Sequence, residues 1–95
     1  MKYFIVEGVL NAEEIEENLM KEHIEYTQKR MEEGLVLLSS LKTDKSGGLF
    51  IMKSDSMESL NAYLNNEPFK REGIQDYKII EFTPHFVNEK AKAWF

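Results

Sequence analysis

A chain of 95 residues is long enough for one domain with a single modest hydrophobic core. Its net charge of -5 argues against binding to nucleic-acid phosphates and to anionic membranes, because no basic block offsets the acids. The absence of cysteine excludes disulfides, thiolate zinc sites and a cysteine nucleophile. The apolar start, MKYFIVEGVL, is too short and interrupted for a signal peptide, and no apolar run reaches transmembrane length, so we expect a cytoplasmic protein.

The first two predicted elements are a strand and a long helix. Residues 3–6, YFIV, are β-branched and aromatic, which is typical of a strand. Asn11 is a favourable N-cap, and Glu14 three residues later completes a capping box. Gly34 is a natural stop beyond a charged run, so the pattern predicts a helix over residues 12–33.

A hairpin comes next. Residues 35–41 (LVLLSSL) and 49–53 (LFIMK) are typical strand sequences, and KTDKSGG between them is turn-forming, which predicts a β-hairpin. Asp55 with Glu58 then opens a second helix, whose apolar residues recur at helical spacing.

Pro68 marks the end of that second helix. It excludes helical dihedrals for the preceding residue, Glu67, so PFKREG is expected to form a short turn or 3₁₀ segment ending at Gly73. Residues 76–82, DYKIIEF, then form the last predicted strand. Residues 84–95 are expected to form a C-terminal tail with one or two helical turns.

The order β-α-β-β-α-β predicts one ferredoxin-like α+β domain over residues 1–95, with two helices on one face of a four-stranded antiparallel sheet. Three of the strands are apolar at both odd and even positions, which indicates a sheet covered on both faces. Two helices cover only one face. We therefore expect a homodimer packed sheet to sheet, with a tail that covers part of the second face as the alternative.

His23 is the most informative residue of the first predicted helix. On a helical wheel it falls at the centre of the apolar face, and Glu16 and Arg30 lie close to the same line. One interpretation is a core histidine bonded to a backbone carbonyl. The other is a general acid or base in a cavity, since an ordinary histidine titrates near neutral pH.

Several stretches together resemble the YCII-related domain family. They are KYFIV, EHIEY with His23, EEGLVLLSSL, GGLFIM and LNNEPFKREGIQDYKIIEF, and they span roughly residues 2–83. The resemblance implies a small ferredoxin-like dimer, described in the family as an alpha/beta barrel. It also implies an active site made of His23 and the acid before the Pro-Phe pair, here Glu67 in place of the family's aspartate.

The chain departs from the family at other positions too. The second strand ends in Ser40-Leu41 instead of Gly-Pro, and Met20 stands where many members have an arginine. The residues that we expect to line the pocket are Tyr26, Ser40 and Phe69, although aromatic side chains in such positions are commonly part of a core.

The function expected from the resemblance is that of a cofactor-independent acid/base enzyme of lyase, isomerase or dehydrohalogenase type, acting on a small metabolite for which an aromatic compound is one candidate. At least one relative removes chloride from an aromatic ring. One alternative is a non-catalytic dimeric module that binds a small molecule or a protein, and another is an oxygenase without a metal. No metal site is expected, because His23 and His85 have no ligand-type spacing.

Overall fold

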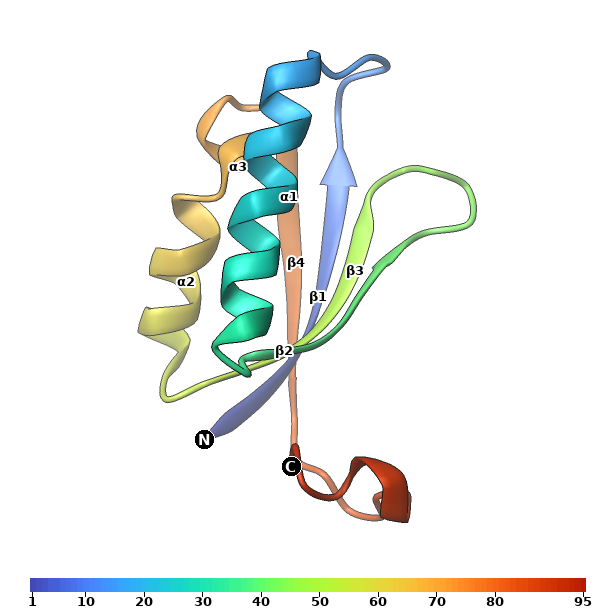
Figure 1. The fold of residues 1–95 in the computed structure, drawn as a ribbon, viewed down its shortest axis with the longest axis vertical. Coiled ribbons are helices and arrows are strands. Elements are labelled where there is room, and N and C mark those ends of the chain that lie inside the picture. The colour runs from blue at the N-terminus through green and yellow to red at the C-terminus, as the bar shows by residue number, and fades with distance from the viewer.

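The computed structural model describes all 95 residues and has four strands, three helices and one 3₁₀ turn (Figure 1). The elements, in chain order, are β1 (Lys2–Leu10), α1 (Glu17–Glu32), β2 (Val36–Leu41), β3 (Gly48–Ser54), α2 (Met57–Asn65), α3 (Pro68–Arg71), β4 (Gln75–Phe82) and η1 (Glu89–Ala91). The predicted strands, the hairpin and the short segment after Pro68 are all present. No helix is both long and apolar enough to cross a membrane.

The strands form one antiparallel sheet in the order β2-β3-β1-β4, which confirms the predicted ferredoxin-like fold. β2 and β4 are free edges, so the sheet of the single chain is not closed into a barrel. Figure 1 shows α1 and α2 side by side over the same face of this sheet. Right-handed crossovers place both helices on that one face.

The core lies between this face and α2. Fully buried side chains of three strands meet two leucines of α2 there, and the cluster is Phe4, Val6, Val36, Phe50, Met52, Leu60 and Leu64. Their register explains the arrangement, because Phe4 pairs with Met52 and Val6 with Phe50, so their side chains point to the same side. α1 contributes only Thr27 to the buried residues.

The start of α1 differs from the predicted one. The helix begins at Glu17, and Glu16 is its N-cap, with side-chain oxygens that accept from the backbone of Asn18 and Leu19 at 3.0 Å. The predicted cap, Asn11, instead continues the sheet and donates its backbone N–H to Ile74 at 2.9 Å. Strand pairing therefore extends β1 beyond the segment that local sequence favours, and it moves the helix start by about one turn.

The second face of the sheet carries rows of residues that run across the strands. At one end Tyr3 and Phe82 are covered by the tail. The Tyr3 ring makes tilted contacts with Trp94 and Phe95, its hydroxyl donates to the Phe95 carbonyl at 2.6 Å, and the Phe82 ring meets the edge of Phe95. At the other end Glu7 pairs with Lys42 at 2.7 Å.

Between these two rows lies an apolar row that spans all four strands. It consists of Leu38, Ile51, Ile5 and Ile80, each the register partner of the next. Ile80 is 60% exposed and Leu38 45% exposed. The tail therefore covers only part of the second face.

Candidate functional site

His23 and Glu67 form the centre of the candidate site. The His23 Nδ1 atom and the Glu67 Oε1 atom are hydrogen-bonded, although the residues lie 44 positions apart in the chain. The His23 side chain is 17% exposed and the Glu67 side chain only 2%. The fold thus brings α1 and the start of α3 together, and it leaves the ring partly accessible beside an enclosed carboxylate.

The local sequence around Pro68 fixes the Glu67 carboxylate. Glu67 is the N-cap of α3, and its Oε2 atom accepts from the backbone N–H groups of Phe69 at 3.0 Å and Lys70 at 3.2 Å. Proline at the first helical position has no N–H to satisfy, which suits this geometry. Because the cap uses one oxygen, the other oxygen of the carboxylate remains for His23.

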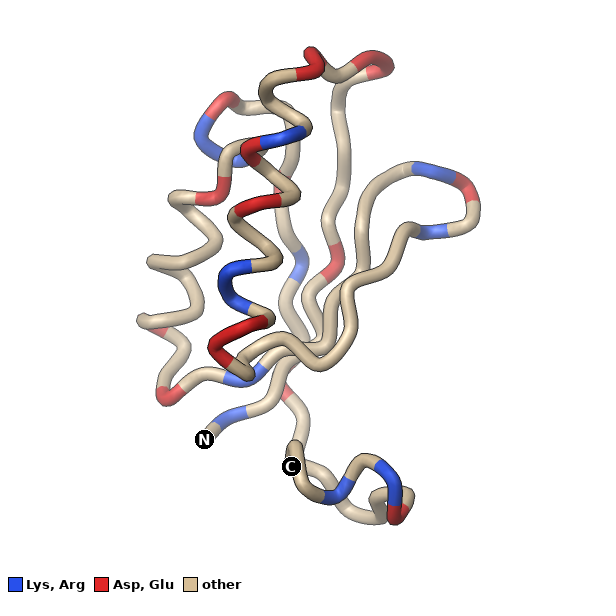
Figure 2. Tube along the Cα trace, in the orientation of Figure 1, with Lys and Arg blue, Asp and Glu red and all other residues tan.

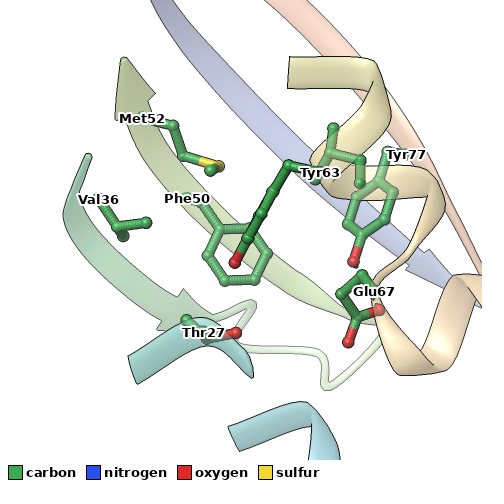
Figure 3. Close-up of a pocket in the computed structure, with 8 residues that line it drawn as sticks. Thr27, Val36, Phe50, Met52, Tyr63, Glu67 and Tyr77 are labelled. Carbon is green, nitrogen blue, oxygen red and sulfur yellow. Dashed lines mark hydrogen bonds between the residues drawn. The ribbon is translucent and has the colours of Figure 1, made fainter. Parts of the chain in front are cut away.

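Two residues of β4 extend the site behind Glu67. The Tyr77 hydroxyl donates to Glu67 Oε2 at 2.8 Å, and Gln75 Nε2 donates to the Tyr77 hydroxyl oxygen at 3.0 Å. Burial, together with the adjacent Glu67 charge, raises the pKa of Tyr77 well above the ordinary value of 10.0. Tyr77 therefore remains a hydroxyl and a donor. Figure 3 shows its oxygen pointing toward the Glu67 carboxylate.

This directed chain of hydrogen bonds assigns the proton on His23. An ionised carboxylate has only acceptor atoms, so opposite the ionised form of Glu67 the His23 Nδ1 atom carries the hydrogen, and in the neutral ring the Nε2 atom then holds a lone pair. The ring also stacks on Phe69, with centroids 3.8 Å apart and planes within 5°. Glu67 and Phe69 together fix both the tautomer and the orientation of the imidazole.

A cleft of about 450 Å³ opens beside His23. Its walls come from α1, the hairpin and the segment before α1, and its apolar lining includes Ile15, Met20, Ile24, Phe50 and Phe69. Glu13 and Lys45 also line it, and Figure 2 shows charges of both signs at the tip of the hairpin loop. A smaller depression of about 230 Å³ also borders His23. The histidine therefore faces open space and a carboxylate, in contrast to a sealed core histidine.

The three predicted pocket residues have different positions. Phe69 lines the cleft and supports His23. Ser40 is part of the lining, but its hydroxyl donates to the Leu49 carbonyl at 2.7 Å, and its register partner Leu49 belongs to the second face. Tyr26 lies outside the cleft, where its hydroxyl donates to the Tyr63 carbonyl at 2.6 Å and its ring stacks on Tyr63.

The sequence interpretation also missed residues of this site. Gln75 and Tyr77 are two positions apart on β4, so their side chains share one face of the strand. That spacing, directly after the turn that contains Glu67, is a signal in the sequence from which they could have been found. Ser39 lies on the edge strand β2, where it pairs with Phe50 on the helix side and lines the cleft.

No group of three or more histidine and carboxylate side chains lies close enough together to hold a metal ion. His85 belongs to the tail, where its ring stacks on that of Phe86. The two histidines of the chain thus have different surroundings, and only His23 borders the cleft.

Comparison with known proteins identifies the family. The YCII-related domain model matches residues 1–83, and a search of the curated proteins finds no match. Among solved structures, the chain is similar to 5-chloro-2-hydroxyhydroquinone dehydrochlorinase from Burkholderia phenoliruptrix AC1100, in complex with 2,5-dihydroxybenzoquinone. The TM-score is 0.64 at 13% identity, over 85% of this chain and 93% of the other. The likeness to that enzyme is one of fold, and the family match covers most of the chain, which belongs to the YCII-related domain family.

Proposed function

We propose that this protein is a cofactor-independent acid/base enzyme acting on a small aromatic metabolite. The observation that carries the proposal is the hydrogen bond from His23 Nδ1 to Glu67, beside a cleft that the ring borders. This bond leaves the His23 Nε2 atom as the basic atom. A positioned histidine of this kind is the most common general acid or base in enzymes.

The proposed chemistry is a proton transfer that the network supports. His23 Nε2 takes a proton from the substrate, and the imidazolium that forms is stabilised by the Glu67 carboxylate at Nδ1. Glu67 itself is held by Tyr77 and two backbone N–H groups, so it keeps its position as the charge on the ring changes.

The similar solved structure suggests one reaction of this type. It is named as a dehydrochlorinase of 5-chloro-2-hydroxyhydroquinone. In such an elimination one hydroxyl proton moves to the carbon that carries chlorine and a second hydroxyl proton is taken by the base. The electron pair of the C–Cl bond departs with chloride, and the ring becomes a hydroxyquinone with a C–H bond where the chlorine was. The atoms and electrons balance without an oxidant. We propose an elimination or isomerisation of this kind for the His23 site.

A variant of His23 tests the proposal directly. Incubation of the protein with 5-chloro-2-hydroxyhydroquinone without oxygen is expected to release chloride, as measured by ion chromatography. His23→Asn keeps an N–H donor for Glu67 but removes the basic nitrogen, so the rate is expected to fall about 100-fold or more. The matched control is His85→Asn, because His85 lies on Phe86 in the tail, and it is expected to keep the wild-type rate.

The alternative function is a non-catalytic module that binds a small hydrophobic molecule. The exposed apolar side chains of Met20 and Ile24 on the cleft wall favour this alternative. It predicts that 2,5-dihydroxybenzoquinone raises the melting temperature while no chloride is released from the chlorinated compound. Equal chloride release by the wild type and His23→Asn would contradict the acid/base proposal.

We also propose that two copies associate through the apolar row of the second sheet face. A row with two strongly exposed members, Leu38 and Ile80, is a typical contact surface. Sedimentation velocity is expected to give about twice the monomer mass of 11.2 kDa. Ile80→Glu is expected to shift the species to the monomer, and a wild type that sediments as a monomer at high concentration would contradict the proposal.

A further inference from the structure

Gln75 donates a hydrogen bond to Tyr77, but this bond alone does not explain why Gln75 also lines the cleft. It is the first residue of β4 and is only 2% exposed, yet it lines the same cleft as His23. Its register partner is Leu10, the last residue of β1 and another lining residue. Gln75 thus places an enclosed polar side chain in a largely apolar part of the cleft.

The two ends of the Gln75 amide differ in their bonding. The Nε2 atom donates to Tyr77 at 3.0 Å, whereas the Oε1 atom accepts no hydrogen bond from the protein. In the whole chain, the only fully enclosed polar side-chain atom without a partner is the Arg30 Nε atom. The Gln75 Oε1 atom is therefore not sealed, and Gln75 is one of the residues that line the cleft. A largely buried acceptor without a partner is stabilised by any donor that forms a hydrogen bond with it.

Neighbouring backbone fixes where this oxygen lies. A Cβ atom at Gly8 would be 2.6 Å from Gln75 Oε1, so the amide occupies the space that a side chain on β1 would take. Tyr77 holds the nitrogen, and its own proton is already directed to Glu67. Rotation of the amide would set the Gln75 oxygen against the Tyr77 oxygen, with no proton between them, so the oxygen end is the end turned away from Tyr77.

We propose that Gln75 Oε1 accepts a hydrogen bond from a hydroxyl or N–H group of the ligand, and that the cleft selects small, planar, neutral molecules bearing such a donor. The inference rests on the proposed function of the cleft and names its substrate class. Phe50 and Phe69 supply apolar walls for a flat ring. A phenol-type hydroxyl bonded to Gln75 would join the hydrogen-bond chain that ends at His23.

The wild-type protein provides the first test, by NMR titration of the ¹⁵N-labelled chain with two probes of similar shape. Hydroquinone has two hydroxyl donors, and 1,4-dimethoxybenzene has none. Hydroquinone is expected to bind about tenfold more tightly, which corresponds to one hydrogen bond, and to shift the side-chain amide resonances of Gln75. Equal affinities, or unmoved Gln75 amide resonances, would overturn the inference.

Two variants test whether Gln75 or another acceptor in the cleft causes the preference for hydroquinone. Gln75→Met has a similar length without an amide, and it is expected to bind both probes with equal affinity. Ser39→Ala removes another cleft hydroxyl, for which the structure shows no partner, and it is expected to keep the tenfold preference. Loss of the preference in Ser39→Ala, or its retention in Gln75→Met, would overturn the inference.

The test remains decisive if Gln75→Met does not fold, because the wild-type comparison of the two probes stands alone. It is also independent of the proposed chemistry. Chloride release with no preference for hydroquinone would remove Gln75 as the donor-recognising residue and leave the acid/base proposal intact. A clear preference without chloride release would keep the subsite and support the binding module.

Discussion

Replacing Glu67 with alanine is expected to lower the free energy of unfolding by about 3–5 kcal/mol, as is typical when one partner of a buried pair is removed. Glu67 is almost fully buried and accepts four hydrogen bonds. The variant leaves the Tyr77 hydroxyl, the His23 Nδ1–H group and two backbone N–H groups of α3 without an acceptor. Urea unfolding followed by circular dichroism measures the loss as a lower midpoint at unchanged slope.

The matched control is another glutamate that pairs with a basic side chain nearby. Glu22 of α1 contacts Arg71 of α3 at 3.0 Å, but the two side chains are 56% and 53% exposed. Because surface ion pairs contribute little, Glu22→Ala is expected to cost about 0.5 kcal/mol or less. Similar losses in the two variants would mean that Glu67 does not organise the site, and the hydrogen-bonded network would then be incidental to stability.

The sequence predicted most of the fold because its strands and turns are locally marked. The hairpin was found from the turn residues between 41 and 49, and the element order followed from the two helices around it. The start of α1 was predicted wrongly for a physical reason. Leu10 pairs with Gln75, and such a partner 65 positions away is invisible to a local capping pattern.

The apolar face of α1 shows a second structural feature that hydrophobic periodicity in the sequence cannot predict. Met20, Ile24 and Met31 lie on the apolar side of the helical wheel, and the structure leaves all three exposed. They border the two depressions beside His23. A helical wheel reports which side chains share a face, but only the packing of α1 against the sheet decides whether that face is core or cleft wall.

The candidate site could be predicted from the sequence only in part. His23 was identified by its place on the wheel, and Glu67 by the resemblance alone, as the acid before the Pro-Phe pair. The structure shows that the two side chains are bonded, while their catalytic role remains a proposal. Tyr77 and Gln75 were missed because a polar pair at alternate positions is common in a strand with a solvated face. Their burial depends on how the turn after α3 places β4.

A second large effect is expected at Gly47, in the hairpin loop that borders the cleft. Gly47 has a φ of +145°, and a Cβ atom there would lie 2.1 Å from the Gly8 carbonyl oxygen and 2.7 Å from its carbon. Both contacts are with backbone, which cannot rotate away as a side chain would. Gly47→Ala is therefore expected to lower the free energy of unfolding by about 3 kcal/mol or more, from backbone strain and overpacking together.

The control for Gly47 is Gly34, which also has a positive φ, +81°, but has no atom within 4 Å of the point where a Cβ would lie. Gly34→Ala carries the backbone strain alone and is expected to cost about 1 kcal/mol in the same urea experiment. Equal losses in the two variants would show that contact with Gly8 is unimportant. The difference between the losses measures how tightly the loop is held against β1.

The Gly47 variant also connects stability to the cleft. The loop is bonded to β1 through the Leu10 N–H group, which donates to the Ser46 carbonyl at 2.8 Å, and Lys45 and Gly47 both line the cleft. If alanine pushes the loop from β1, the wall opposite α1 moves while His23 and Glu67 stay in place. Hydroquinone affinity is then expected to fall in Gly47→Ala but not in Gly34→Ala, as NMR titration would measure. Unchanged hydroquinone affinity in both variants would show that the position of the loop does not affect ligand binding.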